Sequence, residues 1–580
     1  MIEYKSKRQR YDLIFSQLDA ERNSFVPHWK DLSQYILPRR SRFNLSDVNK
    51  GDRRNDKIID NTATLAARTL RSGMMSGITS PARPWFRLTT PDPDMAEFGP
   101  VKQWLTKVQD AMISSYIKSN LYQSLLTMYQ DLGVFGTTAM LFEESLDGDI
   151  FYTEPYPIGS YWLAKDSKGN INTFVREFRM TVRQLIEVFG RKVNGEADWS
   201  NFSIQVRNLY EQGMYESWID VRHMIMPNPN FDPSKPNTRL NKKFMSDYYE
   251  IGSGSGGNYS RSKEDTTFLR ESGYDNFPVL CPRWETSGED VYGTNCPAME
   301  CLGDIKQLQH GEKRIMEAID KKIRPPMTAP TSMRNQVASI LAGDITYIDS
   351  QGNQQGFRPA FEVNFSIAEM SQKQAEVRAR IQRAFYEDLF LMLAESDRRQ
   401  ITAREIMERK EEKLLALGPV LEQLNQGFLD PMTTLAFNIC LSQGLLPPPP
   451  EQLQGVELKV EYISIMAQAQ KLVGISAIER FTGYAGQVAQ FDPSILDKLK
   501  TEQIIDVYAD ITSVPPSILR SDDEVKEIRE NRAKQQQAEA QAQQMQNAVQ
   551  TAQNLSQIKS NDGSNVLDQM LANARAGSVI

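Results

Sequence analysis

The sequence predicts a mixed α+β protein that is predominantly helical. Two long stretches with helical spacing flank an insertion in the middle of the chain. Between 134 and 284 the hydrophobic period changes toward two, which indicates β-strands. A Gln/Ala-rich tract near the C-terminus contains strong helix formers but few apolar anchors. Together these observations predict several subdomains organised around the central helices.

Length and charge exclude some classes of protein. A chain of 580 residues is long enough to bury a sizeable core and to form several domains. Hydrophobic residues make up 40% and charged residues 24%, which is ordinary for a soluble protein. The formal net charge of −7 argues against a protein that coats nucleic acid through an extended basic surface. It does not exclude a protein that lets DNA pass without gripping it.

Cysteine spacing and hydropathy indicate the compartment. The four cysteines show no CxxC spacing, so neither a zinc site nor a disulfide scaffold is predicted, and reduced thiols are expected. No window approaches eighteen apolar residues, and the N-terminus lacks the apolar region of a signal peptide. We therefore expect a protein that is made in a cytoplasm and does not span a membrane.

The first part of the chain is predicted to be helical. Residues 3–37 keep helical spacing, with Pro27 dividing or kinking the element. Asn61 or Thr62 can cap a helix of small residues that runs through Met75. A short strand is expected at 85–88, and two helices follow at about 100–118 and 121–132, the second ending at Gly133.

The middle of the first half is predicted to be β-rich. One helix, about 181–190 with Thr181 as its cap, interrupts the strands. The Gly/Ser-rich loop 252–257 lacks a following Lys-Ser/Thr, so it is interpreted as a flexible hairpin tip and not as a phosphate cradle. The expected strands are 137–143, 150–154, 160–164, 172–179, 216–226, 244–251, 265–270 and 278–284.

The central helices each carry one apolar stripe. At ~25 residues and 1.5 Å per residue, each would be nearly 40 Å long. Two such narrow-striped rods suit the wall of a larger assembly better than the core of a small domain. The stripe residues are Met299, Leu302, Ile305, Leu308, Ile315, Ile319 and Ile323, then Ile367, Met370, Val377, Ile381, Phe385, Leu389 and Met392.

Another long helix is predicted after the central pair. Thr402 and Glu405 form a capping box that opens it, and Pro419 and Pro431 should kink it. Four prolines at 447–450 mark a subdomain boundary. Beyond them the chain is expected to be mostly helical, with one strand at 456–463 and a Gln/Ala-rich helix after 522 that neighbouring copies would stabilise.

Catalytic motifs are not found in the sequence. The three histidines, His28, His223 and His310, lie far from any nucleophile-elbow pattern, and His310 is expected on the polar side of the first central helix. Walker A, HExxH, EF-hand and Rossmann patterns are also missing, so no cofactor or metal is predicted. A structural protein that is not an enzyme is therefore favoured.

Several blocks resemble the portal, or head-to-tail connector, proteins of short-tailed bacteriophages. They occur in that family's order and span about residues 10–440. The segments that carry the resemblance are 59–64, 72–75 and 84–88 near the N-terminus, 288–299 and 303–306 before the first central helix, 324–326 at its exit, and 397–405 and 417–420 after the second.

The resemblance implies the portal fold, with wing, stem, clip and crown, assembled as a ring that usually has twelve subunits. The first stem helix, the clip and the second stem helix would be 291–324, 325–366 and 367–394. A tunnel loop would follow at 395–401. The remaining parts would be a wing at 1–290, a kinked wing helix at 402–446, a crown at 447–520, and a Gln-rich C-terminal helix, barrel and disordered tail at 521–580.

Basic residues of the stem and tunnel loop are candidates to face DNA in the channel. Arg398 and Arg399 are favoured because they lie in the short connector that should face the lumen. For each of the stem charges, a solvated face or an intersubunit salt bridge is favoured over a role in the channel. The stem candidates are Lys306, Lys313, Lys321, Arg380 and Arg383.

The predicted function is a portal at one capsid vertex, through which double-stranded DNA is packaged and ejected. The implied partners are further copies of the chain, the terminase packaging motor, the tail adaptor, and capsid or scaffold proteins, without a membrane. The expected location is the virion, after assembly in the host cytoplasm. An intracellular oligomeric scaffold with long helical arms is the alternative, and a packaging ATPase or nuclease is less favoured because no Walker A loop is found.

Overall fold

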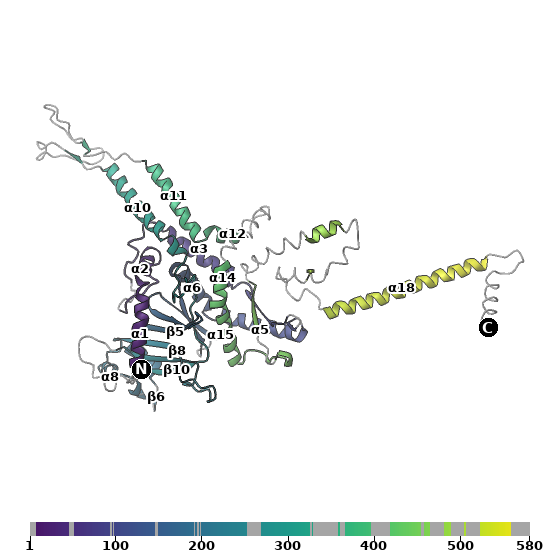
Figure 1. Ribbon diagram of the computed structural model, residues 1–580, viewed down its shortest axis with the longest axis horizontal. Coiled ribbons are helices and arrows are strands. Elements are labelled where there is room, and N and C mark those ends of the chain that lie inside the picture. The colour runs from purple at the N-terminus through teal and green to yellow at the C-terminus, as the bar shows by residue number, and fades with distance from the viewer. Residues whose placement is uncertain are drawn as a thin grey trace. The chain divides into compact units, whose positions relative to one another are not determined.

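The computed structural model contains two compact units, Met1–Ala477 and Ile478–Ile580. Figure 1 shows the arrangement of helices and sheets within the first unit. The structure describes residues 7–45, 51–92, 95–96, 98–145, 149–190, 192–193, 196–197, 199–251, 268–324, 327–328, 358–359, 366–395, 418–453, 458–463, 481–488, 504–505 and 522–557.

Three helices form the N-terminal part of the first unit. These are α1 (Lys7–Asn23), α2 (Val26–Tyr35) and α3 (Thr62–Gly77). Pro27 lies in the first turn of α2, where its missing amide has no partner to lose, so the predicted division is confirmed. The predicted cap of α3 is wrong: Asn61 makes no side-chain cap bond, and Asp60 Oδ1 instead accepts the Thr62 amide at 2.8 Å.

Two antiparallel sheets lie at the centre of this unit (Figure 1). The larger has the order β10-β9-β8-β5-β4 and the smaller β11-β2-β3. Most predicted strands are confirmed; of the strand expected at 265–270 only 268–270 lies among the described residues, and β10 begins there at Arg270. Their bounds are β2 Ala139–Glu144, β3 Phe151–Tyr156, β4 Tyr161–Lys165, β5 Ile171–Thr181, β8 Trp218–Pro227, β9 Phe244–Glu250, β10 Arg270–Tyr274 and β11 Val279–Leu280.

A small lobe connects β5 to β8. It contains α7 (Val182–Phe189) and α8 (Ile204–Glu211), with a 3₁₀ turn (Trp199–Asn201) and the short pair β6 (Lys192–Val193) and β7 (Glu196–Ala197). Thr181 caps α7 in a reciprocal capping box, as predicted. The sequence analysis missed α8, because it has only eight residues, too few for a helical period to stand out, and only Val206 among them is buried.

Two helices and a long-range strand pair complete the main core. The helices are α5 (Gly99–Lys118) and α6 (Leu121–Phe135), and α6 runs past the predicted end at Gly133 to a left-handed Gly136. The strand β1 (Phe86–Thr89) pairs antiparallel with β14 (Lys459–Tyr462). Both strands were predicted, but their pairing was not, because hydrophobic period carries no information about distant partners.

The central helices are present but shorter and more interrupted than expected. They are α9 (Pro297–Glu300), α10 (Leu302–Ile323), α11 (Ile367–Ala384) and α12 (Glu387–Glu395). The expected single helix over 367–394 is therefore two helices. At the base of the insertion, β12 (Met327–Thr328) pairs with β13 (Arg358–Pro359), and the segment between them lies outside the described residues.

The helix expected after the central pair is described from Gly418 onward. It consists of α14 (Gly418–Leu424), a π-helical turn (Asn425–Leu429) and α15 (Asp430–Ser442). Pro431 is the second residue of α15, which begins where the π-helical turn ends, and because it lacks an amide it cannot bond to the carbonyl four residues earlier. The predicted irregularity at Pro431 is thus a π-helical turn, while the predicted Thr402 capping box lies outside the described residues.

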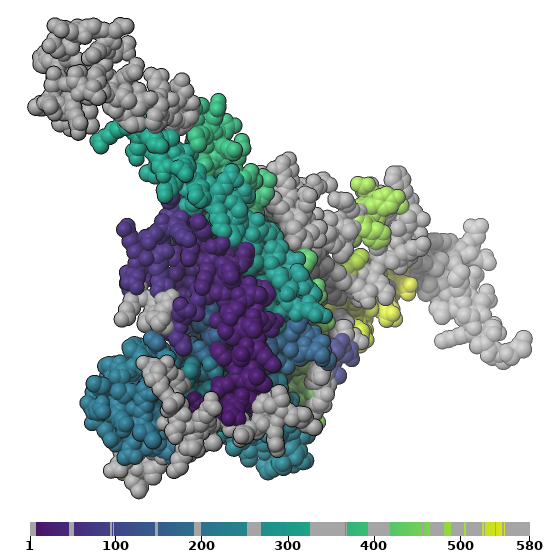
Figure 2. Space-filling view, turned by 60° about the vertical axis from the view of Figure 1, so that its left-hand side comes forward, coloured from purple at the N-terminus to yellow at the C-terminus, as the bar shows by residue number. Residues whose placement is uncertain are grey.

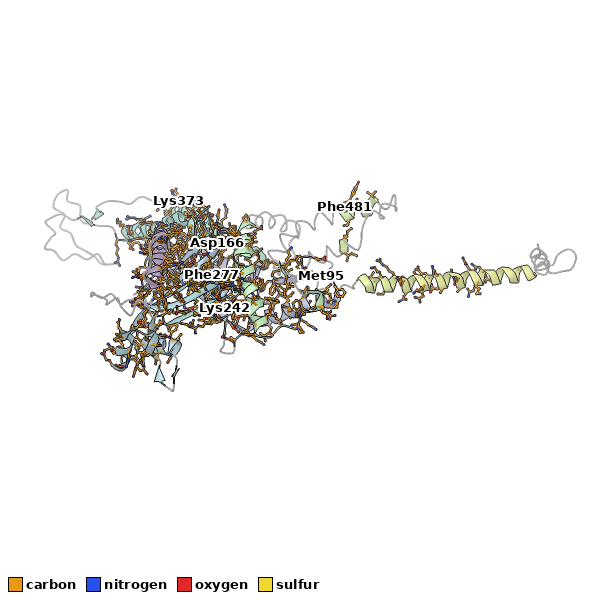
Figure 3. All side chains as sticks on the ribbon, turned by 60° about the horizontal axis from the view of Figure 1, so that its bottom comes forward. Met95, Asp166, Lys242, Phe277, Lys373 and Phe481 are labelled. Carbon is orange, nitrogen blue, oxygen red and sulfur yellow. The ribbon has the colours of Figure 1, made fainter. Side chains whose placement is uncertain are left out.

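The second unit contains a short helix at 481–488 and α18 (Asp522–Gln557). The predicted Gln/Ala-rich helix is confirmed, and its 36 residues correspond to ~54 Å. Most of its described side chains are exposed and project outward along its length (Figure 3). The first unit differs, because side chains such as that of Phe277 pack against its main core.

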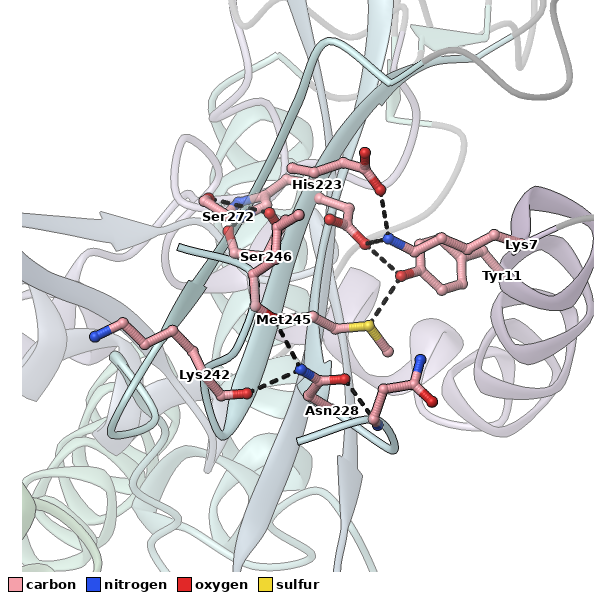
Figure 4. Close-up of polar contacts among 12 residues, drawn as sticks. Lys7, Tyr11, His223, Asn228, Lys242, Met245, Ser246 and Ser272 are labelled. Carbon is pink, nitrogen blue, oxygen red and sulfur yellow. Dashed lines mark hydrogen bonds and ion pairs between the residues drawn. The ribbon is translucent and has the colours of Figure 1, made fainter. Parts of the chain in front are cut away.

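Polar contacts fasten α1 to one face of the five-stranded sheet (Figure 4). Lys7 Nζ lies 2.7 Å from both Asp247 and Glu271, and the Tyr11 hydroxyl donates to Asp247. Burial raises the pKa of Asp247, and these two donors oppose that rise. The contacts fix α1, and with it the start of α2, against the sheet.

All four cysteines are buried free thiols, as predicted. Burial raises the pKa of Cys296 and of Cys301 to about 12, so neither thiol ionises near neutral pH. A buried thiol with such a pKa reacts slowly with oxidants.

A buried ion pair between Arg40 and Asp131 yields the first testable prediction. Arg40 Nε donates to both Asp131 oxygens at 3.1 and 3.2 Å, and the Asp131 side chain is 2% exposed. Arg40→Met leaves that carboxylate buried without a partner, so we expect the free energy of unfolding to fall by about 3–5 kcal/mol in denaturant titrations. Adding Asp131→Leu should restore most of the loss, and an unchanged midpoint in Arg40→Met alone would contradict this role.

Candidate functional site

The helix pair α10–α11 is the candidate functional element, and it extends from the body of the first unit (Figures 1 and 2). Only the part nearest the body, its root, has a fully buried apolar seam. The helices run antiparallel and touch closely at Gly311, where an added Cβ would lie 1.9 Å from Gln374 Nε2. The buried residues of the root are Leu302, Ile305 and Leu308 of α10, Val377 and Ile381 of α11, and Phe385 directly after α11.

A polar cluster, the root clasp, ties the pair to the loop before α3. Its members are Asp60, Gln309, Glu312 and Arg378. Gln309 is 4% exposed, and its Oε1 accepts the amides of Ile59 and Asp60 at 2.6 and 2.8 Å. Its Nε2 donates to the Asp60 carbonyl at 2.7 Å. The buried side-chain amide of Gln309 therefore forms hydrogen bonds with three backbone groups of a loop without regular secondary structure.

Charge completes the root clasp. Arg378 of α11 donates through Nε to Asp60 Oδ2 at 2.8 Å and through Nη2 to Glu312 of α10. Burial acts to raise the pKa of Asp60, but hydrogen bonds from Thr62 and the ion pair with Arg378 outweigh it and lower that pKa. The loop, α10 and α11 thus meet at a single guanidinium.

Two of the predicted channel residues form salt bridges within the chain. Lys306 Nζ lies 2.6 Å from Asp31 of α2, and Arg380 Nη2 lies 2.8 Å from Asp304 of α10. Lys306 therefore joins α10 to the N-terminal helices, and Arg380 joins the two helices of the pair. Lys306 and Arg380 are therefore not simply solvated. Both form salt bridges, but with carboxylates of the same chain.

The other predicted residues are not brought together into one site. Lys313, Lys321 and Arg383 are exposed, and none of them forms an ion pair within the part of the chain that the structure describes. Arg398 and Arg399 lie outside the described residues. The sequence analysis missed Gln309, Glu312 and Arg378, since their partners lie as far as 318 positions away and no local pattern marks them.

A backbone break separates α11 from α12. Tyr386 adopts a positive φ of 55°, which a non-glycine residue rarely does, and its amide bonds to the Arg383 carbonyl at 3.0 Å. The break turns α12 onto α3, where Phe390 is 4% exposed and sits against Gly73. A Cβ on Gly73 would lie 2.1 Å from the Phe390 ring. The chain is thereby anchored before it enters the predicted tunnel loop.

The histidines do not join acidic residues in a candidate metal site in the described part of the chain. No group of three or more His, Cys, Asp or Glu side chains is placed there to hold a metal ion. His223 is buried, stacks on Tyr248 and shares a 2.9 Å hydrogen bond with Ser246 (Figure 4). Burial holds the pKa of His223 well below its usual value, so the ring stays neutral. His310 is exposed, as predicted.

The described helices were also compared with the requirements for a membrane span. None of the described helices combines the length and the apolar character needed to cross a bilayer.

Comparison with known proteins gives matches over nearly the whole chain. The family model described as bacteriophage head to tail connecting protein matches residues 8–519. The chain is 48% identical over 561 residues to the portal protein of Salmonella phage epsilon15, covering 97% of each chain. It is 42% identical over 544 residues to the probable portal protein of Bordetella phage BPP-1, covering 94% of each.

A solved structure of the virion of a native gene transfer agent particle also contains a similar chain. The TM-score is 0.34 at 11% identity, with 73% of this chain and 86% of that chain covered. A score this low does not establish a common fold.

The root clasp predicts a pH-dependent contribution to stability. Because the pKa of Asp60 is lowered from 3.8, its contribution is complete above that pH and is lost as pH falls through the folded-state value. Asp60→Asn should therefore be less stable than the native chain at pH 7, and the difference should begin to shrink below about pH 4, as the pH approaches the lower folded-state pKa. Thermal unfolding between pH 3 and 7 measures the difference. Arg380→Ala is the matched control, and a constant offset at all pH values would refute this role of Asp60.

The contact between α3 and α12 predicts a steric effect. Gly73→Ala places a methyl group inside the Phe390 ring, so α12 must move, and we expect a loss of about 1–3 kcal/mol in the free energy of unfolding. Phe390→Ala removes the two closest atoms, Cγ and Cδ1, and should make the loss in the double variant smaller than the sum of the two single losses. Additive losses in the double variant, measured by denaturant titration, would show that the two residues do not touch.

Proposed function

This chain belongs to the bacteriophage head-to-tail connecting protein family, and we propose that it forms a dodecameric portal ring whose central channel passes double-stranded DNA. The family is structural, and its members are components of the virion. The ring would stand at one capsid vertex, where it serves first in packaging and later in ejection. The terminase motor would supply the force.

The exposed outer half of α10 carries the proposal that the chain is a ring subunit. Met316 is 60% exposed and Ile323 is 70% exposed, although both continue the stripe that is buried at the root. With the half-buried Ile319 between them, these two side chains form an apolar strip along one helix face. A neighbouring subunit in a ring can cover such a strip, because every copy both offers and receives a contact.

The charges of the helix pair suit a channel that guides DNA without holding it. Lys306 and Arg380 are compensated by carboxylates of the same chain. Lys313, Lys321 and Arg383 remain as exposed cations on the described part of the pair. Each phosphate contact adds salt-dependent affinity, so a few scattered cations steer a duplex, whereas a continuous basic wall would stall it. Arg398 and Arg399 would add a second ring of charge at the tunnel loop.

The remaining parts follow the portal plan. The stem would be α10 and α11, and the clip would be the insertion 325–366, which docks the packaging motor and later the tail adaptor. The wing would be 1–290 with the kinked helix 402–446, facing capsid and scaffold proteins. The crown at 447–520 and the C-terminal helix would point into the capsid. Assembly would take place in the host cytoplasm.

Electron microscopy of the purified protein tests the ring. We expect closed rings with a central hole, and light scattering should give a mass near 800 kDa, about twelve times the 66.1 kDa chain. A monodisperse monomer at high protein concentration would overturn the proposal. An extended oligomer of low order would favour the scaffold alternative, which also predicts long helical arms but no closure.

A further inference from the structure

We propose that the loop between β8 and β9 is a preformed docking site for an acidic segment of a partner protein. The loop comprises residues 228–243, and we call it the basic loop. It joins β8, which ends at Pro227, to β9, which begins at Phe244. The inference concerns a single chain, so it goes beyond the proposed ring and does not depend on it.

The basic loop is much longer than its strands require. β8 and β9 are antiparallel neighbours with Pro227 opposite Phe244, and hairpins between such strands usually close with about 2–5 residues. The loop lies at the opposite end of the five-stranded sheet from the small lobe, because that lobe joins β5 to the start of β8. An ordered connection of this length without regular secondary structure is usually functional.

One asparagine side chain holds the two halves of the basic loop together. Asn241 Nδ2 lies within hydrogen-bond distance of three carbonyl oxygens, at 2.9, 3.3 and 3.1 Å, which belong to Asp232, Lys235 and Pro236. Asn241 Oδ1 accepts the Asp232 amide at 3.0 Å. The first half of the loop is therefore bonded to the second half through a single side chain.

The ends of the basic loop are fixed in the same way. Asn228 Nδ2 donates to the Lys242 carbonyl at 3.0 Å (Figure 4). The Asn228 amide donates to the Lys243 carbonyl at 2.8 Å. Three prolines restrict the backbone further, namely Pro229, Pro233 and Pro236. A loop that is ordered before binding loses less conformational entropy when a partner binds.

The basic loop places positive charge on an acidic chain. It contains four basic side chains and one acidic side chain, whereas the whole chain has a formal net charge of −7. Two of the four cations are compensated. Lys242 Nζ lies 2.5 Å from Asp275, and Lys235 Nζ lies 3.4 Å from Asp232. The loop therefore keeps an excess of positive charge after its own ion pairs are formed.

The two remaining cations flank an exposed apolar side chain. Arg239 and Lys243 are exposed, and neither forms an ion pair within the part of the chain that the structure describes. Leu240 is 63% exposed. A single exposed leucine is ordinary on a protein surface, but this one lies beside two unpaired cations on a rigid loop. A segment that carries both carboxylates and an apolar side chain would complement all three.

A protein segment fits these groups better than a nucleic acid does. Two unpaired cations give about two phosphate contacts, which adds little affinity at physiological salt. Base stacking needs an accessible aromatic ring, but the one aromatic residue of the loop, Phe231, is half-buried. Leu240 finds no apolar partner on a phosphate backbone, whereas a peptide side chain can cover it.

A synthetic acidic peptide tests the site. The probe is a fluorescein-labelled peptide of repeated Glu-Glu-Leu units, and the full chain is titrated into it while fluorescence anisotropy is recorded at low salt. We expect saturable binding that weakens as salt is added, because surface charges are screened. Arg239→Glu with Lys243→Glu should lower the affinity by more than about tenfold, since like charges then face the peptide. A native chain that does not bind the peptide would overturn the inference.

Arg68→Glu with Lys107→Glu is the matched control. These side chains are also exposed and form no ion pair among the described residues, and they lie on α3 and α5. The control replaces the same two residue types and changes the net charge equally, so it should alter the affinity by less than about twofold if the contact is local. Equal losses in the control and the loop variant would show that the peptide responds to net charge, and the site would then be rejected.

Substitutions that leave the charge of the loop unchanged give a second readout. Asn241→Ala removes the bonds between the two halves of the loop, so we expect about threefold weaker binding. The thermal midpoint should not change, because the residues of the hydrophobic cores lie outside the loop. Leu240→Ser should weaken binding by a similar factor through lost apolar contact. If neither substitution changes the affinity, the loop is not a preformed site and the inference fails.

A labelled DNA duplex tests the competing class of partner. The native chain and the variant with Arg239→Glu and Lys243→Glu should bind the duplex equally, or neither should bind it. Duplex binding that depends on these two residues, without binding of the peptide, would overturn the inference in favour of a nucleic acid. Ring formation is measured separately by electron microscopy, so failure of the docking site and failure of the proposed function are distinguishable.

Discussion

Within the described residues, the helices α10 and α11 are held only at their root, and the rest of this structure depends on that constraint. The α10–α11 pair buries its apolar seam only at the root, and there a single guanidinium, Arg378, connects α11 to Glu312 and to Asp60. Gln309 binds the loop backbone, and Phe390 fits against Gly73 on the other side. Because all these contacts lie at the root, the direction of the two helices is set by the body of the first unit, and none of these contacts holds the outer half.

Electrostatics in this region are mostly local. The basic residues nearest the root are held by Asp31 and Asp304, so they contribute to the anchoring of the helices before they contribute to any field along a channel. A short ion pair at a partly exposed site adds little stability by itself. Its larger effect here is geometric, since Lys306 relates α10 to α2 and Arg380 relates α11 to α10. The net potential of the rods is lower than their lysine and arginine content suggests.

Local patterns in the sequence predicted much of the fold. The periodicity of 137–251, the Thr181 capping box and the break at Pro27 each depend on near neighbours and were found correctly. The root clasp was not predictable, because Gln309 and Arg378 meet a loop some 250 to 318 residues earlier in the chain. The break at Tyr386 was missed for another reason: the stripe through Phe385 and Leu389 keeps its period across it, and no glycine or proline marks the positive φ. For the predicted channel residues, the sequence indicated which of them lie on the central helices, but it did not indicate which carboxylates they pair with.

The antiparallel pair β1–β14 has a consequence for the order in which the chain acquires its structure. Phe86–Thr89 has its partner at Lys459–Tyr462, with Arg87 and Glu461 joined at 3.1 Å and Trp85 stacked on Tyr462. Synthesis proceeds from the N-terminus, so β1 is made well before β14 and has no strand partner while more than half of the protein is synthesised. Such a non-local contact slows folding and leaves an open strand edge in the meantime. The β1–β14 pair of the first unit therefore forms late, after both central helices have left the ribosome. During that interval the unpaired strand of one nascent chain is most exposed to mispairing with another nascent copy.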